Sequence, residues 1–220
     1  MDAVTCIETR QSIRAFLKDP VPEETLREVV EVAMWSPSYK NTQPWEVMIV
    51  SGEKKEALSA MLIDLLDKGS RPTPDIPEPI KWPETQQARI NRLFEKRKKA
   101  TGLDLSDPEI IKKAKEANFK FYGAPHAVFL FQDRDLPLWS LFDMGLFAQS
   151  LMLAAHAKGL GTVPQAFVTD YARETKKFLG IPETKRLVLG LSMGYPDREA
   201  PQNKLRTDRV PVEEILTMLA

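Results

Sequence analysis

The pattern of apolar and polar positions alternates between helical and extended segments along the chain. Residues 22–35 carry apolar side chains three or four positions apart, from Leu26 to Met34, which is the spacing of one helix face. Mostly apolar runs predict strands at 45–50, at 124–132 and within 185–196. Further segments are expected to be helical: 2–9, 53–67, 85–101, 108–121, 170–180 and 210–219. Helices mixed with a few strands predict an α+β fold, a small sheet with helices packed on both sides.

One segment, 138–159, is apolar on nearly every side. It is about long enough to cross a bilayer, but Asp143, Gln149, Ser150 and His156 argue against that. A helix that is apolar all round in a water-soluble protein is buried, so we expect a central helix with one side in a subunit interface.

Composition and charge narrow the class of protein. With 220 residues, we expect a single domain over 1–220. The 31 basic and 31 acidic residues cancel, so nothing global favours nucleic acid or an anionic membrane as a partner. The single cysteine, Cys6, cannot form an intrachain disulfide, and no Cys, His and Asp cluster suggests a metal. The first residues lack the basic and apolar regions of a signal peptide, so we expect a cytoplasmic protein.

The first candidate site is the stretch RQSIRAF, residues 10–16. In an extended segment, Arg10, Ser12 and Arg14 share one face, with no acid between them. Arginine forks bind phosphate bidentately, so the pattern predicts a phosphate or oxyanion site. The alternative is that both arginines pair with distant acids on the surface.

Three other stretches carry candidate binding groups. The stretch SPSYKNTQPW (36–45) places short hydroxyl and amide side chains in a loop, where they either form turns or read the polar edge of a planar heterocycle. The glycines of GLGTVPQAF (159–167), expected as a turn and a short extended stretch, let the backbone approach a flat ligand. In NKLRTDR (203–209), Lys204 and Arg206 alternate onto one face; the alternative is a solvated tail.

Together and in this order, the four stretches resemble the FMN-dependent nitroreductase family, over residues 1–67 and 120–218. The resemblance implies the α+β nitroreductase-like fold, with a small, mostly antiparallel sheet flanked by helices, in an intertwined homodimer with FMN at the subunit interface. It implies hydride transfer from NAD(P)H through flavin N5 to nitroaromatic or similar electron-poor acceptors, by a ping-pong mechanism without a catalytic side chain. The alternatives are reductive dehalogenation, enone reduction or flavin fragmentation on the same fold, or a non-enzymatic flavin-binding protein.

The resemblance also implies which residues contact the cofactor. The basic residues and the serine would hold the phosphate and the flavin ring, the loop after the first long helix would reach the flavin of the other subunit, and the backbone near 165 would lie against the ring. The implied set is Arg10, Ser12, Arg14, Pro37, Ser38, Asn41, Gln43, Pro164, Gln165, Ala166, Lys204 and Arg206. Asn118 and Lys120 lie near positions where some members contact the flavin.

The stretch 68–118 falls where family members vary and is interpreted as an insertion within the domain. Its first part, 70–83, carries five prolines and is therefore neither a helix nor a central strand. We expect this insertion to form a lid that selects small-molecule electron acceptors. Four aromatic residues are candidates for lining the open face of the flavin: Tyr39, Trp82, Phe94 and Phe121.

Overall fold

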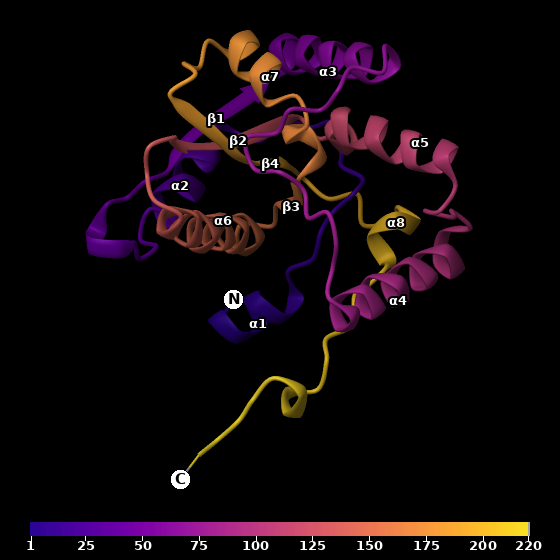
Figure 1. The fold of residues 1–220 in the computed structure, drawn as a ribbon. Coiled ribbons are helices and arrows are strands. Elements are labelled where there is room, and N and C mark those ends of the chain that lie inside the picture. Colours follow the sequence, from indigo (N-terminus) through magenta and orange to yellow (C-terminus); the bar gives the residue numbers. More distant parts are fainter. Residues whose placement is uncertain (220) are drawn as a thin grey trace.

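The computed structural model describes residues 1–219 and contains a four-stranded sheet with helices on both faces (Figure 1). The strands are β1 (Glu46–Ser51), β2 (His126–Asp133), β3 (Gly161–Gln165) and β4 (Lys185–Gly194). The helices are α1 (Ala3–Thr9), α2 (Glu23–Ala33), α3 (Gly52–Asp67), α4 (Glu84–Thr101), α5 (Pro108–Phe119), α6 (Trp139–Ala157), α7 (Ala172–Leu179) and α8 (Pro201–Lys204). Short 3₁₀ turns are η1 (Tyr39–Asn41), η2 (Phe121–Gly123), η3 (Phe167–Thr169) and η4 (Val212–Glu214).

The sheet has the order β1-β2-β4-β3, and every neighbouring pair is antiparallel. This confirms the predicted α+β fold with a small antiparallel sheet. The segment expected to be a turn and a short extended stretch contributes a full edge strand, β3, whose Gln165 pairs with Gly190 of β4. Gly190 is required there, since a Cβ atom would lie 2.0 Å from Cγ2 of Val168.

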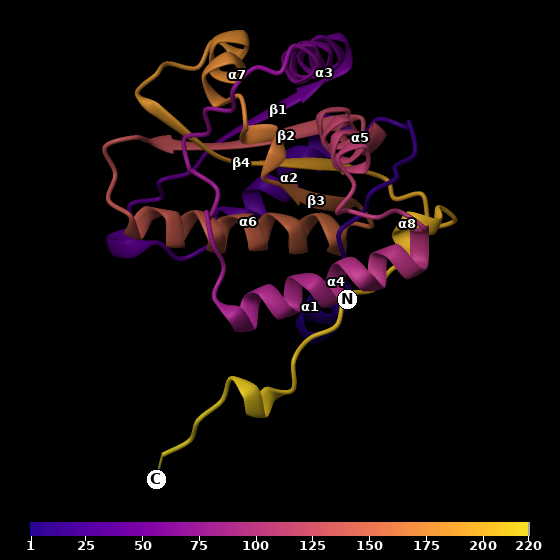
Figure 2. The ribbon, with the colours of Figure 1, turned by 45° about the vertical axis from the view of Figure 1, so that its right-hand side comes forward.

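Two hydrophobic cores cover the two faces of the sheet. Successive side chains of β2 point to opposite faces, so Val128 and Leu130 enter one core while Phe129 and Phe131 enter the other. The first core lies against α2 and α6, and the second against α3, α5 and α7 (Figure 2). Both cores are needed because β2 and β4 are apolar on both sides.

Helix α6 is the predicted central helix, and its middle and carboxyl-terminal parts are buried through residues such as Phe147 and Leu151. Its amino-terminal end leaves Leu138, Trp139 and Phe142 exposed. Within residues 1–219, no helix combines the length and the apolarity that a membrane span requires.

The helix expected over 210–219 does not form. Only η4 is helical there, and Ile215, Met218 and Leu219 are exposed. In both ribbon views the tail runs away from the body of the chain (Figures 1 and 2). A short amphipathic segment is marginal as a helix unless its apolar face packs on another surface, and up to residue 219 the apolar side chains of this segment are exposed.

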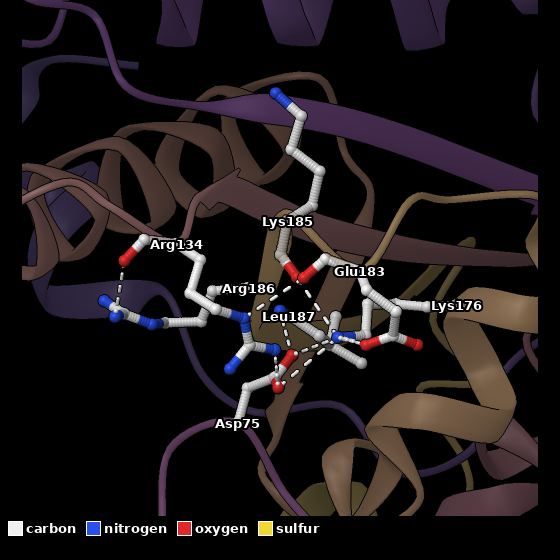
Figure 3. Close-up of polar contacts among 7 residues, drawn as sticks. All are labelled: Asp75, Arg134, Lys176, Glu183, Lys185, Arg186 and Leu187. Carbon is white, nitrogen blue, oxygen red and sulfur yellow. Dashed lines mark hydrogen bonds and ion pairs between the residues drawn. The ribbon is translucent and has the colours of Figure 1, made fainter.

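The proline-rich start of the insertion is attached firmly to the body. Asp75, which is nearly buried, pairs with Lys176 of α7 at 3.1 Å and with Arg134, and it accepts a hydrogen bond from Leu187 N at 2.8 Å (Figure 3). Thr73 N also donates to Asp170 O at 2.7 Å. The start of the insertion is therefore fixed to the body of the chain, and α4 is the part of the insertion that extends away from the sheet (Figure 2).

Candidate functional site

The two ends of the chain meet beside strand β3. The segment after α1 lies along this strand, where Ile13 N donates to Thr162 O at 3.0 Å. The approach is close because of Gly161, at which a Cβ atom would lie 2.7 Å from Cγ1 of Ile13. Buried Asn203 of α8 then holds the other end of the chain on this segment, because its Nδ2 donates to Ala15 O at 2.9 Å.

A cavity of about 550 Å³, which we call the arginine cavity, lies between α1, the end of α6 and the chain ends. No acidic residue of the described chain lines it, and its polar lining includes Thr9, Arg10, Gln11, His156, Arg198 and Arg206. Nη1 of Arg10 is buried and has no hydrogen-bond partner within residues 1–219. Arg206 Nη1 donates to Thr9 O at 2.9 Å, which fixes this second guanidinium at the cavity wall.

The electrostatics of the arginine cavity favour an anion. Burial lowers the pKa of Arg10, and the neighbouring Arg209 and Arg206 lower it further. Burial also lowers the pKa of His156, with added repulsion from Arg10, Arg206 and Arg198. Concentrated positive charge without a carboxylate among the described residues is the arrangement that binds a phosphate group.

The structure brings together some of the predicted basic residues and separates others. Arg10 and Arg206 line the arginine cavity, whereas Arg14 lines a different one. Ser12 forms an isolated bridge with Thr162, and exposed Lys204 lies 3.6 Å from Glu199. The segment from 10 to 16 pairs with the sheet through isolated bridges and not as a regular strand, so strict alternation does not bring all its polar side chains to one cavity.

The second cavity, which we call the insertion cavity, measures about 600 Å³ and lies between α4, α5 and α8. Its basic lining residues are Arg14, Arg97 and Lys113. Most of the remaining lining is apolar, with side chains such as Leu103, Leu105, Ile110, Ala114 and Leu205. Burial lowers the pKa of Arg97, and repulsion from Arg14 lowers it further.

Strand β3 presents a mixed surface at the edge of the sheet. Pro164 and Ala166 are exposed, while Gln165 is buried between them. The Gln165 side chain accepts from Ser192 Oγ at 2.6 Å and donates to Asn118 O at 2.9 Å. Both Gln165 and Asn118 are thus engaged inside the fold, and the open surface at this point of the chain is formed by Pro164 and Ala166.

Lys120, the other residue suggested near the flavin, is exposed at the end of α5. Its ammonium lies 3.9 Å from a carboxylate oxygen of Glu116. It lines neither the arginine cavity nor the insertion cavity.

The loop 36–44 lies at the other end of α6 from the arginine cavity. Tyr39 N donates to both carboxylate oxygens of Asp143, at 3.1 and 3.2 Å, and the Tyr39 ring stacks on Trp139. Ser38 Oγ accepts from Gln43 N at 3.0 Å and so closes the loop. The predicted residues Pro37, Asn41 and Gln43 are exposed.

The four predicted aromatic lining residues divide into two groups. Tyr39, Trp82 and Phe94 are exposed, and none of them lines either cavity. Phe121 is completely buried in the second core, where it packs edge to face on Phe129. The prediction that Phe121 lines an open face is wrong for this chain, because the apolar ring completes the core under β2.

Three residues of these cavities were missed or dismissed in the sequence. Arg198 has no neighbouring motif, Arg97 lies in the basic run 96–99, which is typical of a solvated helix face, and His156 is typical of an ordinary helix residue. All three line cavities that form only where segments distant in sequence come together, so no local pattern identifies them as lining residues. Among the described residues, no group of three or more His, Cys, Asp or Glu is placed to hold a metal.

Comparison with known proteins gives consistent relationships. A sequence model of the Nitroreductase family matches residues 7–195. The chain is 36% identical over 214 residues to a 4-nitrobenzoate reductase of Pseudomonas putida, covering 94% of this chain and 90% of that protein.

Solved structures agree with the sequence relatives. The crystal structure of the FMN-dependent nitroreductase NfnB from Mycobacterium smegmatis in complex with NADPH matches with a TM-score of 0.94 and 34% identity, covering 99% of this chain and 98% of that one. The FMN and NADPH-dependent nitroreductase NfnB from Sphigopyxis sp. strain HMH matches with a TM-score of 0.95 and 27% identity over the whole of both chains.

Proposed function

The chain belongs to the nitroreductase family, and on that basis we propose that it is an FMN-dependent oxidoreductase that uses NAD(P)H to reduce nitroaromatic or similarly electron-poor compounds. The observation that carries the proposal is the arginine cavity, where Arg10 and Arg206 from the two ends of the chain meet without a carboxylate among the described residues. A mononucleotide phosphate matches this charge.

The residues present fit the phosphate of FMN. The buried, unpartnered Nη1 of Arg10 needs an acceptor, and a phosphate oxygen supplies one. Arg206 and Arg198 add charge at the same cavity, and each charge-assisted hydrogen bond contributes about 1.5–3 kcal/mol. Exposed Lys204, which follows the lining residue Asn203 and lies 3.6 Å from Glu199, is proposed as a further phosphate contact.

The flat part of the cofactor would lie along the edge strand β3. Exposed Pro164 and Ala166 leave the backbone of this strand accessible, and Gln165 is held inward by Ser192 and Asn118, which keeps the strand rigid. Ser12 and Arg14, on the segment beside β3, are the proposed polar contacts to the ribityl chain and ring. When bound, FMN supplies the hydride chemistry between NAD(P)H and the acceptor, and the protein holds the ring and excludes water.

We further propose that the functional unit is a homodimer. Tyr39 stacks on Trp139 at one end of α6, while His156 at the other end lines the arginine cavity. At 1.5 Å per residue, these ends lie about 25 Å apart, so the loop 36–44 is far from that cavity in its own chain. Its polar residues Ser38 and Asn41 would therefore contact the cofactor held by a second copy.

Exposed apolar residues support the same assembly. Tyr39, Leu138, Trp139 and Phe142 are all exposed around the start of α6, and Trp35, at the end of α2, is exposed as well. Large exposed apolar patches mark interaction surfaces. The apolar tail after η4 also lies free of its own chain, as expected of a segment that packs on a partner.

The test starts from the purified protein. A flavoenzyme is expected to be yellow, and its visible band should bleach anaerobically on addition of NADPH or NADH. A yellow protein that does not bleach would be a binding protein, and a colourless protein that takes up no FMN would contradict the proposal. Turnover with nitroarenes, set against enones and halophenols, then separates nitroreduction from the alternative reductions.

A further inference from the structure

The insertion cavity contains two guanidinium groups that the fold does not neutralise. Arg14 and Arg97 both line it, and the mutual repulsion is strong enough to lower the pKa of Arg97, after the larger effect of burial. Within residues 1–219, neither side chain makes an ion pair or a side-chain hydrogen bond. Partly buried positive charge without a counterion costs free energy, so the cavity is prepared for an anion.

The size and the apolar lining of the insertion cavity indicate which group accompanies the negative charge of its ligand. About 600 Å³ lies within the usual range for small-molecule sites. Leu103, Leu105 and Ile110 provide an apolar wall, and no acidic residue among those described lines the cavity. An apolar ring with one negative group satisfies both parts of the lining.

The two arginines belong to different parts of the chain. Arg14 comes from the segment beside β3 and is already a proposed cofactor contact, whereas Arg97 comes from α4 of the insertion. Helix α4 lies beside α8 in both ribbon views (Figures 1 and 2), and residues of both helices line the cavity. Once a cofactor engages Arg14, Arg97 and Lys113 are the basic lining residues that remain for a second ligand, and Arg97 is the one with a guanidinium fork.

We propose that Arg97 makes the insertion cavity selective for acceptors that carry a carboxylate on an aromatic ring. The inference rests on the proposed function, since it names the class of acceptor for that reaction. The guanidinium of Arg97 binds the carboxylate bidentately, and the ring lies against the apolar wall. The phosphate on the ribose of NADPH is another possible source of negative charge, but the apolar lining suits a ring better than a nucleotide.

The test compares an acid with its neutral isostere. Wild type and Arg97→Gln are assayed with 4-nitrobenzoate and with 4-nitrobenzamide, and the binding of unreactive benzoate is measured by calorimetry. We expect Arg97→Gln to raise the KM for the acid and the Kd for benzoate about tenfold, with the KM for the amide changed less than twofold. Arg97→Lys should fall between the two, because it keeps the charge and loses the fork.

The matched control is Lys99→Gln, which removes the same charge from an exposed position of α4 outside the cavity. It should behave as wild type. Equal benzoate affinity in Arg97→Gln and Lys99→Gln would overturn the inference, as would equal effects on acid and amide. So would a change confined to the preference for NADPH over NADH.

The failure of the proposed function gives a different result. If wild type reduces neither acceptor but benzoate binding still depends on Arg97, the anion site stands and the reductase does not. If wild type reduces both acceptors and benzoate affinity is independent of Arg97, the reductase stands and the selectivity does not.

Discussion

The side-chain oxygen of Asn203 accepts a hydrogen bond from the backbone N–H of Arg14 at 2.7 Å, across almost the whole length of the chain. Nδ2 of the same side chain donates to Ala15 O and to Asp197 O. Both amide hydrogens and the amide oxygen of Asn203 are therefore engaged. A buried, fully bonded asparagine fixes the carboxyl-terminal region on the segment that carries Arg10 and Arg14.

Replacing Asn203 by alanine should loosen this connection. Arg14 N and Asp197 O would lose their partner, while Ala15 O would keep the hydrogen bond from Asp197 N. Each unsatisfied buried group costs about 1–3 kcal/mol. We expect a loss of about 2–4 kcal/mol in the free energy of unfolding, measured with urea. Gln202→Ala, at the exposed neighbouring position, is the control and should change stability little. Similar stability in both variants would contradict the role of Asn203.

The Asp75 anchor should contribute strongly to stability. Burial alone would raise the pKa of Asp75, but the hydrogen bonds from Leu187, Arg134 and Lys176 outweigh it and hold the pKa below its ordinary value. Lys176 is only 1% exposed, so Asp75→Asn would remove the counterion of a buried cation. We expect a loss of about 3 kcal/mol, at the lower end for a buried pair because Glu183 still contacts Lys176.

The control for Asp75 is Asp64→Asn, which breaks an exposed ion pair with Lys68 on α3. Such a pair contributes about 0–1 kcal/mol. Thermal or urea unfolding of the two variants measures the difference, and equal losses would contradict a buried anchor. The sign of the pH effect is also fixed: a depressed carboxyl pKa stabilises the fold above pH 3.8, and this contribution is lost as the pH falls through the folded-state value.

His126 should make the fold weaker in mild acid. Val21 N donates to its Nε2 at 2.9 Å, so that nitrogen must stay unprotonated. Burial, and then Lys55, lowers the pKa of His126. The contribution of neutral His126 to the free energy of unfolding is therefore fully present above about pH 6.5. It falls as the pH drops toward the folded-state pKa, by at most about 1.4 kcal/mol per pH unit.

Urea unfolding between pH 7.5 and pH 5 tests this expectation. His126→Gln should flatten the fall, and the double variant with His156→Gln should remove the histidine contribution entirely, since the chain has two histidines. A slope unchanged by His126→Gln would show that its protonation is not coupled to folding.

The proposed homodimer can be tested at the start of α6. Phe142 is 61% exposed in one chain, so Phe142→Asp should leave the monomer fold intact and place a charge in the interface. Light scattering on a sizing column should give a dimer for wild type and a monomer for the variant. Ile80→Asp, at a fully exposed apolar position in the insertion, should remain dimeric. A monomeric wild type would contradict the assembly.

Helices whose apolar pattern lies within one continuous segment were predicted well from the sequence. The apolar periodicity of 22–35 and the continuous apolar run of 138–159 become α2 and α6, because burial of those faces is decided within each segment. The tail at 210–219 has a similar periodicity and forms no helix beyond η4. Through residue 219 its apolar side chains remain exposed, and a local pattern cannot show whether a helix face will find a surface to pack on.

The candidate site was predictable only in part for the same reason. Arg10 and Arg206 were found because each lies in a short motif, and the structure brings both to one cavity. Arg198 lies in no such motif, and the basic run 96–99 around Arg97 predicts only a solvated helix face. The surroundings of both arginines come from segments far away in sequence. The positions of Arg14 and Ser12 relative to Arg10 depend on isolated bridges instead of a regular strand, so alternation was a poor guide.

The most direct measurement of the central claim compares the affinity of the protein for FMN and for riboflavin, which lacks the phosphate. Wild type should bind FMN far more tightly than riboflavin. In Arg10→Gln and Arg206→Gln, the affinity for FMN should fall by about 10–100-fold while that for riboflavin stays nearly unchanged. If both variants keep the wild-type preference for FMN, the arginine cavity does not hold the phosphate, and the account of this site is wrong.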